Sequence, residues 1–195
     1  MQKIKLFSQY NLDAIFLKTR REIFDQLRQW PERYFDSEQI QSHIEALKQP
    51  LQLHLPDIDF KKGHQVLAER IYPASVFQPG HKSNSKFRVT VLIFQYPAQG
   101  QLYLLGCCPP MDVPEPIGEW YVDPVHQQIT IEYLEYEKHP KKALAAHQNY
   151  ITSLQLCYES LKSELAAFNN ELDNMIDAAI TERKRENDDM KGMLV

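Results

Sequence analysis

Glycine is scarce in this chain, with six copies among 195 residues, and no glycine-rich phosphate-binding loop occurs. Long apolar runs are also missing, because no stretch approaches the roughly 18–20 apolar residues that a membrane helix needs. A basic excess is missing as well, since the net charge is −4 and both signs are dispersed along the chain. Phosphate binding needs a concentrated basic surface, so we expect neither a membrane protein nor a nucleic-acid binder.

Cysteine is rare too, and its three copies have no disulfide-framework spacing. Cys107 and Cys108 are adjacent, and neighbours in a strand point to opposite faces, so a bond between them would be strained. The N-terminal residues 1–5 carry positive charge without an apolar run after them, so we expect no signal peptide. Reduced cysteines in a bacterial-type cytoplasm are the simplest interpretation.

Two helices are predicted near the N-terminus. Apolar residues between 9 and 30 recur at helical spacing, and Pro31 ends that segment. A second helix is expected from about Ser37 to Lys48, with Ser37 as its N-cap and Pro50 just beyond its end.

The middle of the chain is predicted to be β. Residues 66–71 and 87–96 are rich in branched and aromatic side chains, which favours strands. A turn at 97–100 would lead into a returning strand at 101–106, and a last strand is expected near 128–134. Four strands joined mostly by short turns predict an antiparallel sheet with one covered face, and hence an α+β fold.

The clearest pattern lies between Pro140 and Gly192, where no glycine or proline interrupts the chain. Apolar residues alternate there at spacings of three and four over about five heptads, which indicates a coiled-coil-like helix. This seam consists of Ile151, Leu154, Tyr158, Leu161, Leu165, Phe168, Leu172 and Met175. A helix of this length is too long to bury within one small domain, so we expect a homo-oligomer through it. The rival interpretation packs the seam on the sheet and N-terminal helices of the same chain.

The predicted organisation is therefore an α+β domain over residues 1–138, followed by a long C-terminal helix over 139–195. The domain would contain two N-terminal helices and an antiparallel sheet of about four strands.

No pattern predicts a catalytic, cofactor or metal site. The seven histidines lack the spacing of zinc ligands, although His139 and His147 can share a helix face. The segment 57–62 holds two aspartates and two lysines, as some nuclease motifs do, but in the wrong order. Packing is the expected role of Cys107 and Cys108, because a cysteine nucleophile needs a base and a lowered pKa.

Two loops are candidates for binding. The polar loop 80–86 contains His81, Lys82 and Lys86, which predict an anion-binding loop; the alternative is a solvated hairpin loop. The proline-rich loop 109–118 presents apolar groups on a stiff backbone. The alternative interpretation of this segment is a crossover loop that packs on the sheet and binds nothing.

A set of segments in the second half forms a recognisable pattern of residue types: the predicted hairpin Val91–Gly106, the proline-rich loop, the strand Ile129–Ile131 and the helical segment Phe168–Arg185. Over residues 85–190 this pattern resembles a segment of bacterial defence-type multidomain proteins, which precedes a TIR or restriction-nuclease-like effector domain. In those proteins an asparagine-leucine pair is followed by an isoleucine and an Arg-Lys doublet. The resemblance implies a regulatory or assembly segment, with no catalytic residues to assign and with the effector domain missing from this chain.

The leading prediction is a non-catalytic assembly or sensing module of a larger cytoplasmic bacterial protein, in antiphage defence. One alternative is a small enzyme or ligand-binding protein with a pocket between sheet and helices, and another is a stand-alone adaptor that binds a protein partner. We expect no cofactor and no metal. The expected partners are a second copy of the chain and a covalently linked effector domain. A histidine beside a cysteine or a carboxylate pair in a concave pocket would favour the enzyme.

Overall fold

A computed structural model describes residues 3–35, 38–77, 85–110, 119–134 and 139–192 of the chain. The chain packs as two compact units. Unit 1 consists of Met1–Tyr10 and Leu55–Leu161, and unit 2 consists of Asn11–His54 and Lys162–Val195. The sequence predicted a boundary at residue 138. The two units do not follow that boundary, because the long helix α3, Pro140–Gly192, contributes to both of them.

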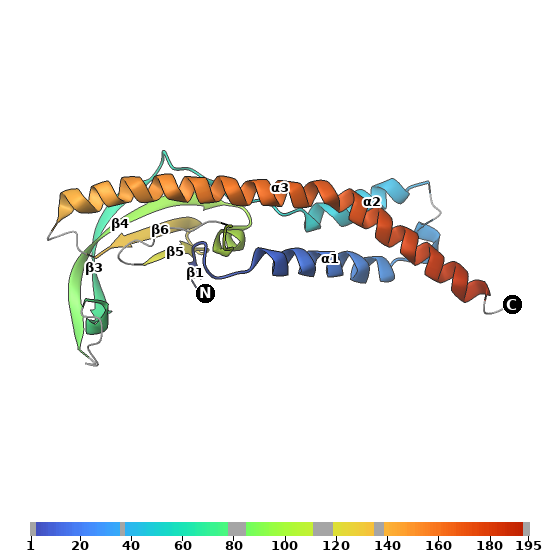
Figure 1. Ribbon diagram of the computed structural model, residues 1–195, viewed down its shortest axis with the longest axis horizontal. Coiled ribbons are helices and arrows are strands. Elements are labelled where there is room, and N and C mark those ends of the chain that lie inside the picture. The colour runs from blue at the N-terminus through green and yellow to red at the C-terminus, as the bar shows by residue number, and fades with distance from the viewer. Residues whose placement is uncertain (1–2, 36–37, 78–84, 111–118, 135–138, 193–195) are drawn as a thin grey trace. The chain divides into compact units, whose positions relative to one another are not determined.

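Unit 1 contains a six-stranded antiparallel sheet within the described residues (Figure 1). Its strands are β1 (Ile4–Lys5), β2 (Asp57–Ile58), β3 (His64–Pro73), β4 (Lys86–Gln99), β5 (Trp120–Asp123) and β6 (Gln128–Tyr133). Four of them pair in the order β1-β5-β6-β4. The other edge of β4 pairs with both β3 and β2, which contact different parts of it. The predicted antiparallel sheet and α+β class are confirmed.

Side chains alternate between the two faces of this sheet, as the period of two requires. Phe94, Tyr96 and Tyr133 lie on the face that the first part of α3 crosses (Figure 1). The opposite face carries a buried apolar cluster of Tyr72, Val91, Ile93 and Leu134. The sheet is therefore buried on both faces near its centre, which is more than the one covered face expected from the sequence.

The predicted strand at residues 101–106 is wrong. Leu102–Gly106 forms a short 3-10 helix, and its Leu105 carbonyl accepts a hydrogen bond of 2.8 Å from the Phe7 N–H. Strand β4 instead continues to Gln99 and pairs with β6. A short apolar run signals burial, but it does not distinguish a strand from a buried helical turn.

Unit 2 contains α1 (Leu12–Arg28), α2 (Ile40–Lys48) and the part of α3 that follows Leu161 (Figure 1). The two predicted N-terminal helices are confirmed. The Asn11 side chain caps α1 by accepting a hydrogen bond of 2.9 Å from the Ala14 N–H. Ser37, the expected cap of the second helix, lies outside the described residues.

Polar and aromatic contacts join the helices of unit 2. The rings of Phe16 and Phe168 stack with their centroids 4.3 Å apart. The Asn169 amide donates to the Leu53 carbonyl at 2.8 Å and accepts from the Leu53 N–H at 2.9 Å. Lys48 forms an ion pair of 2.7 Å with Asp173.

The predicted seam of α3 is buried within the chain itself. Leu154, Leu161 and Leu172 have no exposed surface, and Ile151, Leu165 and Phe168 are buried as well. Tyr158 and Met175 are half-buried. The first four seam residues belong to unit 1 and the last four to unit 2. This burial matches the intrachain interpretation of the seam, while the oligomeric state stays a prediction.

Candidate functional site: a cleft beside His147

His147 lies in an early turn of α3 and is only 5% exposed. Its Nε2 lies 2.7 Å from the Tyr96 hydroxyl, and its Nδ1 lies 3.1 Å from the Tyr133 hydroxyl. The imidazole also stacks on Phe94, with ring centroids 3.4 Å apart. The two hydroxyls and the stacked ring fix the orientation of His147 against the sheet.

These three polar side chains are uncharged at neutral pH. Burial lowers the pKa of His147 to about 4, and it raises the pKa values of Tyr96 and Tyr133 above the ordinary range. A neutral imidazole has one N–H donor and one acceptor nitrogen. It therefore accepts a hydrogen bond from one tyrosine and donates to the other, whose own hydroxyl hydrogen stays available for another acceptor.

Tyr96 and His147 line a cleft of about 790 Å³ in unit 1, which is within the range of small-molecule sites. Pro97 and Ile151 complete its floor. Residues 57–62 form one wall, and they span β2 and the start of the connection to β3. The cleft thus lies between the sheet and α3.

Local hydrogen bonds shape the wall of the cleft. The Asp59 carboxylate accepts from the N–H groups of Lys61 and Lys62, each at 3.1 Å, and pairs with the Lys62 ammonium at 3.0 Å. The hydrogen bond from the Lys62 side chain lowers the pKa of Asp59. At Gly63, a Cβ atom would lie 2.2 Å from the Tyr96 ring, so only glycine lets the loop pack this closely on that ring.

Amide side chains form the outer rim of the cleft. Gln148 and Gln155 flank Ile151 on α3, at the spacing that places residues on one helix face. Gln99 reaches the cleft from the end of β4. All three glutamines are exposed. The Phe60 ring adds an aromatic surface, tilted by 54° at 5.6 Å from Tyr96.

The sequence did not single out His147 as a site residue. It lies four residues before Ile151 and so continues the alternating spacing of the seam. A histidine in an otherwise apolar seam was the available signal. His139, with which it was expected to share a helix face, is exposed.

The loop predicted to bind anions contributes little to the described structure. His81 and Lys82 lie outside the described residues, and Lys86 is an exposed residue at the start of β4. Residues 111–118 of the proline-rich loop also lie outside them. Both binding sites therefore stay predictions.

The two buried cysteines of unit 1, Cys107 and Cys157, are poor nucleophiles. Burial raises the pKa of Cys107 to about 12 and also raises that of Cys157. Their thiols are therefore protonated at neutral pH. The partners of His147 are tyrosines rather than a cysteine or a carboxylate pair. Within the described part of the chain, no three histidine, cysteine or acidic residues gather as a metal site would require.

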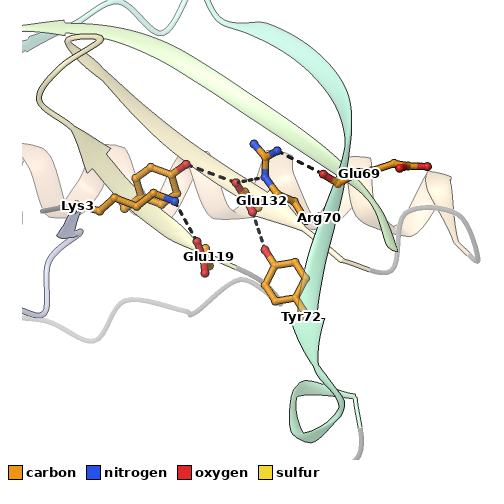
Figure 2. Close-up of polar contacts among 7 residues, drawn as sticks. Lys3, Glu69, Arg70, Tyr72, Glu119 and Glu132 are labelled. Carbon is orange, nitrogen blue, oxygen red and sulfur yellow. Dashed lines mark hydrogen bonds and ion pairs between the residues drawn. The ribbon is translucent and has the colours of Figure 1, made fainter. Parts of the chain in front are cut away.

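A buried carboxylate lies on the opposite face of the sheet (Figure 2). Glu132 is 1% exposed and accepts a hydrogen bond of 2.6 Å from the Tyr72 hydroxyl. Tyr121 Oη lies 3.5 Å and Arg70 Nε 3.6 Å from its other oxygen. Burial, together with the hydrogen bond to Glu132, raises the pKa of Tyr72.

This Glu132 cluster joins three strands, because Arg70 and Tyr72 belong to β3, Tyr121 to β5 and Glu132 to β6. An adjacent ion pair links Lys3 to Glu119 at 3.3 Å (Figure 2). The carboxylate offers almost no exposed surface to a ligand. We therefore assign the Glu132 cluster a structural role and treat the cleft as the candidate site.

No protein family model, curated protein or solved structure matches this chain. The geometry of the cleft consequently carries the functional argument.

The low pKa of His147 predicts a specific loss of stability in mild acid. The unfolded chain binds a proton at this histidine below its ordinary value of 6.5, whereas the folded chain binds it only below about 4. The free energy of unfolding should thus fall as the pH drops through this window, by about 3 kcal/mol in total.

Urea denaturation of the native chain and His147→Gln at pH 7.0, 5.5 and 4.0 measures this loss. The two proteins have all other titrating groups in common. The difference between their free energies of unfolding should therefore shrink by about 3 kcal/mol towards pH 4. A difference that does not change with pH would contradict the neutral, buried imidazole.

Proposed function

We propose that this chain is a ligand-sensing module whose binding site is the cleft beside His147. One observation carries the proposal: a cleft of ligand size combines apolar side chains with the fixed polar pair Tyr96 and His147. Buried polar groups cost stability unless they are hydrogen-bonded. Oriented polar groups beside apolar side chains are typical of sites that recognise a small molecule.

The proposal is for binding rather than catalysis. A reaction would need a nucleophile or metal held beside a base. Beside the charged residues of the wall 57–62, the cleft offers phenol, amide and imidazole groups, and the low pKa of His147 makes it a weak base at neutral pH. Such groups orient and recognise a ligand through hydrogen bonds.

We also propose that the module acts in the bacterial cytoplasm as part of a larger protein of the defence type. The resemblance of residues 85–190 to regulatory segments supports this setting. Cys107, Cys108 and Cys157 are free thiols, as expected in a reducing compartment. None of the described helices combines the length and apolar character needed to cross a bilayer. Self-association through α3 and a linked effector domain are further predictions.

Filling the cleft tests the proposed function. Gln148→Trp places a large side chain at the rim, and Asn149→Trp is the matched control because its exposed side chain does not line the cleft. A metabolite library is screened by thermal denaturation of the native chain. A ligand at a hundred times its Kd should stabilise the folded chain by about 2.7 kcal/mol.

We expect Gln148→Trp to abolish this stabilisation and Asn149→Trp to retain it. Two outcomes would contradict the proposal. Either no compound stabilises the native chain, or the compounds that do so stabilise Gln148→Trp equally well.

A further inference from the structure

The floor of the cleft carries no net charge. Tyr96 and His147 are neutral at neutral pH, and Ile151 and Pro97 are apolar. The charged residues of the lining belong to the wall 57–62, where two lysines balance two aspartates. A ligand that enters this floor would lose its hydration, which is costly for an ion without a partner.

The rim offers hydrogen bonds without charge. Gln99, Gln148 and Gln155 each present an amide with both donors and an acceptor. Within the described residues, none of these side chains has a hydrogen-bond partner in the structure. Gln148 and Gln155 lie on one face of α3, so their amides can contact the same ligand.

An aromatic surface completes the set of interactions. Phe60 is half-buried, and its ring lies beside that of Tyr96 in the same cleft. A flat ligand ring can stack on such a surface. The ligand ring would stack on the exposed part of Phe60, because the 5.6 Å between the Phe60 and Tyr96 centroids leaves no room for a ring between them.

We infer that the ligand of this cleft is an uncharged planar heterocycle of the nucleobase or nucleoside class. This inference rests on the proposed function of the cleft. Nucleobases combine a stacking surface with in-plane N–H and C=O groups, and glutamine amides pair with such edges. The balanced charges of the wall give no preference for a phosphate, so the base and not an anion is the recognised group.

Calorimetric titration of the full chain tests the inference. The probes are adenosine, guanosine, cytidine and uridine, each beside its 5′-monophosphate. We expect at least one nucleoside to bind and its monophosphate to bind no more than about threefold more tightly. Gln148→Ala and Gln155→Ala should each weaken the binding roughly fivefold to tenfold. Gln65→Ala is the control, because this exposed glutamine of β3 does not line the cleft.

Three results would overturn the inference. One is the absence of nucleoside binding at millimolar concentration while other compounds from the thermal screen still bind in the cleft; the proposed function would then survive. Another is binding of the monophosphates alone, which would make the recognised group an anion. The last is nucleoside binding that Gln148→Ala and Gln155→Ala leave unchanged, which would place the ligand elsewhere. Failure of the thermal screen itself would instead count against the proposed function.

Discussion

Replacing Leu161 by aspartate is expected to unfold unit 1. Leu161 has no exposed surface and lies at the centre of the predicted seam. A carboxylate at this position would be buried without a partner, or would need to be protonated. We expect the free energy of unfolding to fall by more than about 4 kcal/mol, a large part of the stability of an ordinary domain. Urea denaturation followed by circular dichroism measures the loss.

Leu156→Asp is the matched control, because Leu156 belongs to the same helix but is 58% exposed. Its effect should stay within about 0.5 kcal/mol. Leu165→Asp tests the seam in unit 2 in the same way, since Leu165 is buried there. Light scattering distinguishes the two interpretations of the seam. A lower mass with retained folding would favour an interface between chains and contradict the intrachain packing of α3.

Replacing Glu132 by alanine is expected to lower the free energy of unfolding by about 2–4 kcal/mol. The Tyr72 hydroxyl would lose its 2.6 Å partner in a buried position, and an unsatisfied buried group keeps its full desolvation cost. The removed side chain would also leave a cavity in a site that is 1% exposed. Chemical denaturation of both proteins at neutral pH measures this change.

Two further variants separate the causes. Glu132→Gln retains an oxygen that can accept the Tyr72 hydrogen bond, so it should recover about half of the loss. Glu119→Ala removes a half-exposed carboxylate from the Lys3 ion pair and should cost at most about 1 kcal/mol. If Glu119→Ala and Glu132→Ala had equal effects, the buried cluster would not be a stabilising centre of the sheet.

The long and strongly periodic elements could be predicted from the sequence. The helices α1 and α3 and the strands β4 and β6 carry an apolar period of the right kind, and β3 was predicted from its branched side chains. Strands β1 and β2 span two residues each and β5 spans four, which is too short for a period to appear. Residues 101–106 show a second limit of prediction from sequence, because their apolar run indicated burial but did not distinguish a strand from a helical turn.

The candidate site was less predictable because it is assembled from segments distant in sequence. The proximity of the segment 57–62 to Tyr96 depends on the pairing of β2 and β4. The sequence predicted a sheet with one covered face, whereas the face that carries Glu132 is buried as well. Only the position of His147 in the seam was a signal that a single sequence could provide.

Nuclear magnetic resonance can show directly whether a bound compound occupies the cleft beside His147. The native chain is titrated with a compound from the thermal screen, and the backbone amide and ring signals are followed. The largest shifts should belong to the cleft residues Phe60, Tyr96, His147 and Gln148, and Gln148→Trp should remove them. Shifts confined to unit 2 or to β3, with the His147 ring signals unmoved, would contradict the proposed binding site.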